Sequence, residues 1–190
     1  MSKMELRLAG SGGQGVILAT VILAEAAVLA GKYTAQSQSY GPEARGGSCK
    51  AEVLISDEPI AFTKVQNPTL LMALTQKSLE KYTAKLPESC RILMDDSLIL
   101  PENIDPNRVT ALPILRTAKD EIKKAMTANI VAVGAINSIL HLVPDEVLRE
   151  AVMMHVPRGT EALNAKALDC GLSLLAKQQE EKEGADREDS

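Results

Sequence analysis

The sequence predicts one α/β domain of three layers, with helices on both faces of a sheet and a Rossmann-like strand–helix–strand unit at its start. Three observations support this fold class. Short apolar strands alternate with helices along the chain, a glycine-rich turn separates the first strand from the first helix, and 190 residues suffice for one domain with a sizeable core. Because aromatic residues make up only 2% of the chain, that core is aliphatic.

The first unit is a strand, a helix and a second strand. Met4–Ala9 alternates as a short strand. After a glycine loop, Val16 to about Ala30 forms an apolar helix, which Gly31 ends. Tyr33–Ser39 follows as the second strand. A unit of this kind predicts that the two strands pair in parallel.

The rest of the chain continues the alternation and ends in a charged tail. We assign residues 1–177 to the α/β domain and interpret 178–190 as a solvated, disordered tail, because it has no apolar periodicity. The further strands are expected at Cys49–Ser56, Thr69–Leu74, Arg91–Met94 and Val109–Pro113. The further helices are expected up to about Leu86 and at Ala118–Met126, Asn129–Leu142, Asp145–Met153 and Thr160–Lys177.

Composition argues against several classes of function. The net charge of −4 gives no global basic field for nucleic acid or anionic lipid. Cys49, Cys90 and Cys170 are far apart, so we expect no iron–sulfur cluster and no metal site in this chain. The start shows no secretory pattern, and the apolar run Val16–Ala30 is too short to cross a membrane. Together these features predict a cytoplasmic protein.

The loop between the first strand and the first helix is one candidate binding site. Gly10, Gly12 and Gly15 fit the pattern G-x-G-x-x-G, and the candidate site includes Gly13 and Gln14 as well. Glycines let the backbone turn tightly and approach a ligand, and free N–H groups at a helix N-terminus can hold a phosphate. The alternative is that these glycines only make a tight turn and close helix–sheet packing.

Two common nucleotide motifs do not fit this loop. A dinucleotide site would place an acidic residue at the end of the second strand, and Tyr33–Ser39 contains none. A P-loop needs Lys and then Ser or Thr where Val16 and Ile17 stand. The sequence therefore disfavours both NAD and a Walker-type nucleotide site.

The segment Tyr40–Gly47 is denser in special residues than a connection needs. Pro42 and the glycines set an unusual backbone path. The guanidinium of Arg45 suits a phosphate or a carboxylate, and Glu43 is placed to pair with it or to orient it. The alternative is a tight surface turn with a solvated Arg and Glu. The candidate residues of this segment are Tyr40, Gly41, Glu43, Arg45, Gly46 and Gly47.

Taken together, the two loops resemble those of a known family. GSGGQGVILA at 10–19 and SYGPEARGGSCKAEVLISDEPI at 39–60 are similar to the gamma subunit of 2-oxoacid:ferredoxin oxidoreductases. Weaker similarity at Met94–Asp96, Asn129–Gly134 and Asn164–Gly171 extends the resemblance along nearly the whole globular part. The YGPEARGG form, followed by Lys50, resembles the 2-oxoglutarate type more than the pyruvate type.

The resemblance implies one part of a heteromeric enzyme. It implies that alpha and beta subunits hold thiamin diphosphate and decarboxylate the oxoacid. Iron–sulfur clusters of a ferredoxin-like subunit would then pass electrons to ferredoxin, and coenzyme A would accept the acyl group. The gamma subunit would help to seat coenzyme A, so the glycine loop and Arg45 become its candidate contacts. No residue of this chain is expected to be catalytic.

Other interpretations stay open at this point. The chain could instead be a stand-alone nucleotide- or acyl-CoA-binding module, a gamma subunit specific for pyruvate or a branched-chain oxoacid, or a structural subunit whose loops only make interfaces. Cys49 is the one tempting thiol, and we expect it to be a buried strand residue. A surface normally covered by partner subunits predicts that the isolated chain associates with itself or exposes an apolar patch.

Overall fold

The computed structural model describes residues 3–40 and 48–188, which form a six-stranded mixed sheet in the order β2-β3-β1-β4-β5-β6. Strands β1, β4, β5 and β6 pair in parallel, whereas β3 is antiparallel to β1 and to β2. The six strands are β1 (Met4–Ser11), β2 (Tyr33–Tyr40), β3 (Ser48–Ser56), β4 (Leu70–Ala73), β5 (Arg91–Asp95) and β6 (Val109–Leu112). All six expected strands are present, and the predicted α/β class is confirmed.

β2 lies one position further from β1 than the sequence suggested. Leu8 of β1 pairs with Ala51 of β3, and Ala51 pairs in turn with Gln38 of β2. β1 and β2 thus run in the same direction with one antiparallel strand between them. The expected parallel pairing of these two strands is wrong, because β2 and β3 form a hairpin whose second strand fills the place beside β1.

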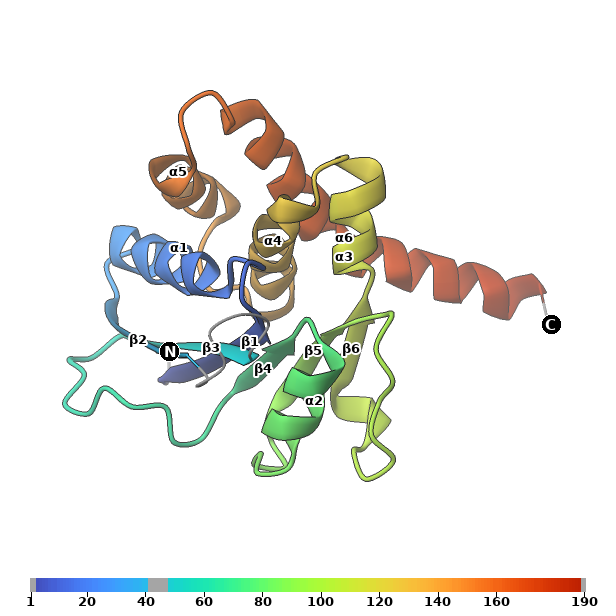
Figure 1. Cartoon of the computed structure of the whole chain (residues 1–190), viewed down its shortest axis with the longest axis horizontal. Helices are drawn as coiled ribbons and strands as arrows, with labels where there is room; N and C mark the ends of the chain where they lie inside the picture. The colour runs from blue at the N-terminus through green and yellow to red at the C-terminus, as the bar shows by residue number, and fades with distance from the viewer. Residues whose placement is uncertain (1–2, 41–47, 189–190) are drawn as a thin grey trace.

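Helices lie on both faces of the sheet, as Figure 1 shows. On one face, α1 packs on β2 and β3, and α5 packs on α1. On the same face, α6 packs on α4. On the other face, α2 packs on β1 and β4. Alternation along β1 separates the two cores, since Leu8 lies in the core with α1 and Ala9 packs in a smaller one with Tyr82 of α2. The helices are α1 (Val16–Leu29), α2 (Gln76–Thr83), α3 (Ile114–Arg116), α4 (Ala128–Leu140), α5 (Asp145–His155) and α6 (Glu161–Glu188).

The crossing of α4 and α6 brings two backbones into direct contact. A Cβ atom on Gly134 would lie 2.7 Å from the carbonyl oxygen of Leu168, and one on Gly171 would overlap the carbonyl of Val131. Glycine at both positions is what lets the two helices approach this closely. Because α4 is buried along nearly its whole length, this crossing holds the centre of the larger core.

Two helices differ from their expected extents. In place of a helix over Ala118–Met126, α3 runs into a π-type turn over Thr117–Glu121 and a 3-10 turn over Ala125–Thr127, because Lys123 adopts a positive φ of 62° that breaks the helix. At the other end, α6 continues as helix to Glu188 rather than ending at Lys177, so most of the expected disordered tail is helical. Gln, Glu and Lys are strong helix formers, and they extend a helix whose first turns are already fixed by packing.

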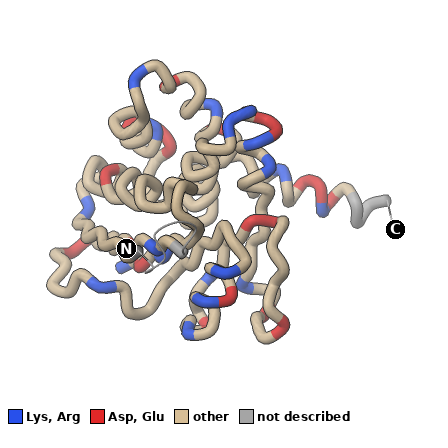
Figure 2. The backbone as a smooth tube through the Cα atoms, viewed as in Figure 1, with Lys and Arg blue, Asp and Glu red and all other residues tan. Residues whose placement is uncertain are grey.

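The described surface carries mixed charge. Lys and Arg are interspersed with Asp and Glu, including along the projecting end of α6 (Figure 2). None of the described helices combines the length and the apolar character needed to cross a membrane.

Candidate functional site

The glycine loop joins the end of β1 to the start of α1 and is held by its own glutamine. The side-chain oxygen of Gln14 accepts a hydrogen bond of 2.7 Å from the Ser11 N–H, and its amide nitrogen donates to the carbonyl of Leu74 at 3.4 Å. The Ser78 hydroxyl donates to the carbonyl of Gly10 at 3.2 Å. The loop is therefore fixed to β4 and α2 before any ligand arrives.

The loop presents the N-terminus of α1 without a cap. Gly15, the N-cap residue, is left-handed with φ 68°, no side chain caps the helix, and its first turn contains no acidic residue. The positive end of the helix dipole and the backbone N–H groups of the first turn remain available to an anion. Such an end is suited to a phosphate or a carboxylate.

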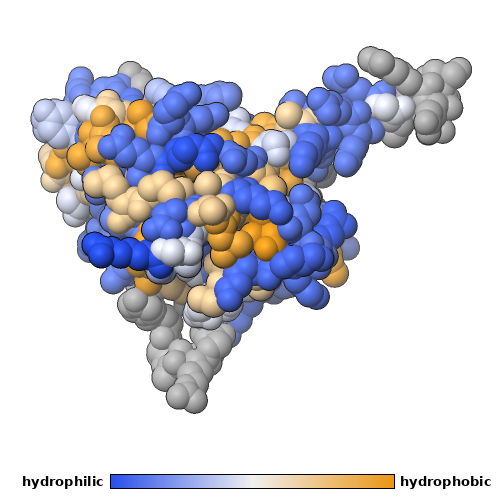
Figure 3. All heavy atoms as spheres, turned by 90° about the horizontal axis from the view of Figure 1, so that it is seen from above, coloured by the Kyte–Doolittle hydropathy of each residue, from blue (hydrophilic) through white to orange (hydrophobic). Residues whose placement is uncertain are grey.

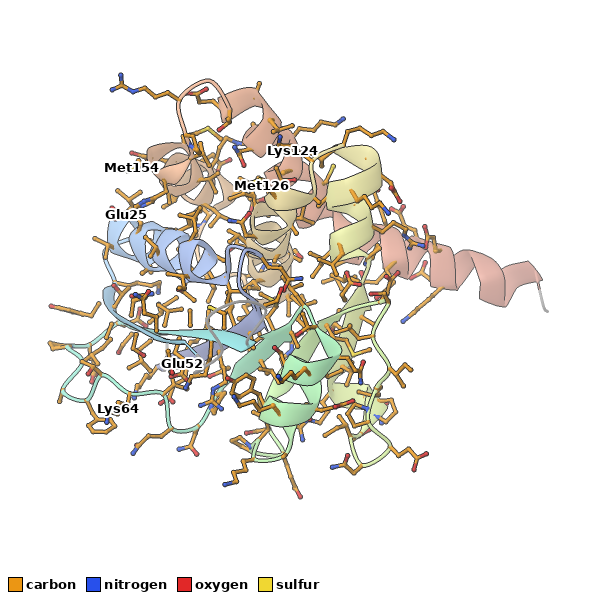
Figure 4. All side chains as sticks on the ribbon, in the orientation of Figure 1. Glu25, Glu52, Lys64, Lys124, Met126 and Met154 are labelled. Carbon is orange, nitrogen blue, oxygen red and sulfur yellow. The ribbon has the colours of Figure 1, made fainter. Side chains whose placement is uncertain are left out.

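A pocket of about 240 Å³ opens beside this helix end. Gly13 and Gly15 form one wall, and the other walls come from the turn before α4 and from the segment between α5 and α6. Its lining is mostly apolar, and Lys124 supplies a cation at the rim. Figure 4 shows Lys124 and Met126 close together beside the start of α4. The remaining lining residues are Leu18, Thr127, Asn129, Ile130, Val156, Pro157, Thr160, Leu163 and Asn164.

Asn129 is one of the polar residues that line this pocket. The residue is only 5% exposed, and its side chain makes no hydrogen bond within the described part of the chain. Its amide packs directly on Gly15, where a Cβ atom would lie 2.6 Å from the amide nitrogen. Among the described residues, Asn129 is not one whose polar side-chain atoms are sealed off without a partner, so its amide is reachable from the pocket and can pair with a ligand.

The β2–β3 hairpin closes next to the glycine loop. Cys49 pairs with Gly10 of β1 on one side and with Tyr40 of β2 on the other, so the hairpin ends at the same edge of the sheet as the loop. Tyr40 is the last residue of β2. Five of the predicted contacts lie outside the described residues: Gly41, Glu43, Arg45, Gly46 and Gly47.

Lys50 lies away from the pocket. Its ammonium group pairs with Glu52 at 3.0 Å, and Glu52 also accepts a hydrogen bond of 2.6 Å from Arg7. Alternation along β3 places both β3 residues on the face opposite α1, and Figure 4 labels Glu52 below the sheet. Lys50, which helped to distinguish the family subtype, is thus part of an ion-pair cluster on that face.

Neither the cysteines nor the buried carboxylate of Asp95 forms a second reactive site. Cys49 is buried in β3, as expected, and its burial raises the pKa of the thiol, which disfavours the nucleophilic thiolate. Asp95 is fully buried and accepts hydrogen bonds from the Leu115 N–H at 2.7 Å and from Ser97. Its carboxylate is used to fix the turn after β5 and the start of α3.

The pocket joins segments that the sequence did not bring together. The glycine loop was predicted as a site, whereas Lys124, Met126 and the residues between α5 and α6 were not. Asn129 was part of a weak similarity only. The signal that could have singled it out is a polar residue in the first turn of a helix whose next seven residues are apolar or glycine. Another hollow, of about 490 Å³ beside Lys3 and 56–62, lies at the opposite end of β1 and contains none of the predicted residues.

The chain is similar to known proteins over nearly its whole length. Residues 5–174 match the family model described as pyruvate ferredoxin/flavodoxin oxidoreductase. The chain is 44% identical to 2-oxoglutarate synthase subunit KorC of Methanocaldococcus jannaschii, over 90% of this chain and 94% of that protein. It is 38% identical to the subunit of the same name from Methanothermobacter marburgensis, over 91% of this chain and 97% of that protein.

Solved structures agree with the fold. The gamma subunit of a keto/oxoacid ferredoxin oxidoreductase from Geobacter sulfurreducens matches with a TM-score of 0.82 and 42% identity, over 92% of this chain and 97% of that one. A 2-oxoglutarate:ferredoxin oxidoreductase from Magnetococcus marinus has a TM-score of 0.81 at 23% identity, over 91% of this chain and 31% of that one. The glycine loop, the strand order and these matches lead to one conclusion: the chain belongs to the pyruvate ferredoxin/flavodoxin oxidoreductase family.

Proposed function

We propose that the chain is the gamma subunit of a 2-oxoglutarate:ferredoxin oxidoreductase and contributes to the coenzyme A-dependent oxidative decarboxylation of the oxoacid to an acyl-CoA. The 2-oxoglutarate assignment rests on the KorC relatives, which match over 94% and 97% of their length. The YGPEARGG form of the second loop supports the same subtype. The observation that carries the cofactor assignment is the unpaired Asn129 amide against Gly15, beside the uncapped end of α1.

Coenzyme A suits this pocket chemically. Its phosphates match the end of α1 and the cation of Lys124. An amide of its pantetheine arm could pair with Asn129, and the apolar lining suits the rest of that arm. A volume of about 240 Å³ holds only part of so long a molecule, so partner subunits would have to complete the site. Arg45 and the other residues of the second loop remain proposed contacts of the same cofactor.

The proposal assigns the other steps to other chains. Thiamin-binding alpha and beta subunits would decarboxylate the oxoacid, and a ferredoxin-like subunit with iron–sulfur clusters would pass electrons to ferredoxin in the cytoplasm. Among the described residues, no group of three or more His, Cys, Asp or Glu side chains is placed to hold a metal ion. In this division of labour the gamma subunit binds and orients coenzyme A, and the chemistry occurs on groups held by its partners.

Two substitutions test the site in the assembled enzyme. We expect Arg45→Ala to raise the KM for coenzyme A by roughly one to two orders of magnitude, because a charge-assisted contact with phosphate is lost. We expect Asn129→Ala to raise it about three- to tenfold, through loss of a neutral hydrogen bond. The KM for 2-oxoglutarate should stay within about twofold in both. Steady-state kinetics with each substrate varied in turn measures this.

Arg116→Ala and Asn107→Ala are the matched controls, since Arg116 pairs with Asp96 at the surface and Asn107 bonds within its own turn. If the Arg45 variant fails to assemble, Arg45 is an interface residue. If both variants assemble with unchanged constants, the loops are structural and the coenzyme A assignment is wrong, while the family membership stands.

The isolated chain should have no oxidoreductase activity and no iron–sulfur absorbance. The reason is that Cys49 lies in β3, Cys90 just before β5 and Cys170 in α6, and that the sequence lacks a thiamin-binding motif. The measurement is reduction of viologen or ferredoxin with 2-oxoglutarate and coenzyme A, using the purified single chain and the full complex side by side. Turnover by the single chain would overturn the assignment of catalysis to the partners.

A further inference from the structure

One side of α1 is apolar and only partly covered. The helix contains a single charged residue, Glu25, yet its stripe Ile17, Val21, Ala24 and Val28 is only partly buried, and Val28 is 51% exposed. These four residues recur at intervals of three and four and therefore share one side of the helix. The face drawn in Figure 3 shows that hydrophobic residues gather in patches among hydrophilic ones on this molecule. A continuous apolar stripe on a helix indicates that something packs on it.

Directly beside this stripe lies an open sheet edge. β2 is the last strand of the sheet and pairs only with β3, and no other hydrogen bond within the described residues reaches its backbone. Its sequence, YTAQSQSY, contains no charged residue and no proline. Natural edge strands are commonly protected by charges, prolines, bulges or short length. At eight residues, about 27 Å, β2 is long for a bare edge.

The stripe and the edge form one surface. The side chain of Gln36 in β2 donates to the hydroxyl of Thr20 in α1 at 3.1 Å, which fixes the helix directly over the edge strand. On the helix surface, the stripe lies next to Thr20 and on the side away from α5. α5 packs near Glu25, where its His155 forms an ion-pair contact. Figures 1 and 2 show α1 alongside this end of the sheet with little charge on either element.

We propose that this surface is an interface between two copies of the chain, in which the two β2 strands pair antiparallel across a two-fold axis and the two α1 stripes meet. An isologous contact of this kind brings each residue against residues of the same strand, so any charge near the axis would meet its own kind. β2 carries none. The neighbouring charges are paired: Lys50 and Glu52 of β3 lie opposite Ser39 and Ser37 and pair with each other at 3.0 Å, and Lys32 is paired with Asp57 at 2.8 Å. The pairing satisfies the open backbone groups of both edges and covers both stripes.

A second copy explains both features better than a small ligand does. A strand edge about 27 Å long beside a helix about 21 Å long has the extent of a protein interface, and an apolar stripe matches its own image without complementary charges. The resulting sheet would continue through twelve strands, since each copy supplies six. The pocket at the glycine loop lies at the α5 side and the N-terminal end of α1, so the interface leaves it open.

The test is the solution mass of the full-length chain. We expect a dimer by sedimentation velocity, and we expect Val28→Lys and Gln38→Lys each to give a monomer, because each places like charges at the interface. Ile99→Lys is the control, since Ile99 is 77% exposed and lies far from β2 in the loop after β5. It should remain a dimer. Circular dichroism confirms that each variant is folded.

Hydrogen exchange gives a second measurement that needs no substitution. In the dimer, the β2 amides that point away from β3 should exchange more slowly as protein concentration rises, whereas those of β6, the opposite edge strand, should not change. A wild-type chain that is monomeric at every accessible concentration overturns the proposal, as does a dimer that survives both lysine variants. If Val28→Lys only blocks assembly with partner subunits, a different chain occupies the surface and the proposal is equally wrong.

Discussion

Gly171→Ala should lower the free energy of unfolding by about 3 kcal/mol, the upper range for an overpacked core. The added methyl group would meet the backbone of Val131, and backbone cannot rotate aside as a side chain can. α6 would have to move away from α4 and open the larger core. Gly134→Ala should lower the free energy of unfolding by a similar amount, because its methyl group would meet the backbone of Leu168. Urea unfolding of the isolated chain measures both.

Gly184→Ala is the matched control on the same helix. No atom lies within 4 Å of a Cβ placed there. The change should leave stability unaltered or raise it by up to about 1 kcal/mol, through the better helix propensity of alanine. Equal effects at Gly171 and Gly184 would mean that helix propensity, and not the close crossing of α4 and α6, explains the glycines.

Alanine at Gly12, Gly13 and Gly15 of the loop should give graded losses. Gly12→Ala should be nearly neutral, because a Cβ there meets nothing and the backbone is not left-handed. Gly13→Ala should cost about 1–2 kcal/mol, since its φ of 94° strains any L side chain even in open space. Gly15→Ala should cost most, about 3 kcal/mol, because a φ of 68° is combined with a clash against Asn129.

The same series separates stability from binding. Gly15→Ala displaces Asn129 and the first turn of α1, so in the assembled enzyme it should raise the KM for coenzyme A at least tenfold, whereas Gly12→Ala should change it less than threefold. Thermal unfolding and steady-state kinetics on the same preparations compare the two effects. A Gly15 variant with wild-type coenzyme A kinetics would remove the loop from the binding site.

Local patterns predicted the elements, and non-local pairing decided where they lie. The alternation of β1 and β3 and the apolar run of α1 were sufficient to find them. The position of β2 was not predictable in this way. β3 lies between β1 and β2, and this order depends on pairing between strands that no local pattern specifies. The break at Lys123 depends on tertiary packing that overrides a good helical sequence.

The candidate site was only partly predictable for the same reason. The glycine loop is a local motif, and its place at the end of β1 follows from the strand–turn–helix order. Lys124, Asn129 and the segment 156–164 lie more than a hundred residues further along the chain. They reach the loop because α4, α5 and α6 fold back over α1. No periodicity in the sequence predicts that contact.

The position of α1 has a consequence for synthesis on the ribosome. This helix is made among the first thirty residues, yet α4 and α5, which cover it, begin only at Ala128 and Asp145. At about 5–20 residues per second, translation leaves an apolar segment without its cover for roughly ten seconds. The growing chain therefore depends on chaperones or on the nascent sheet to shield it, and slow codons before α4 would lengthen the interval in which it can aggregate.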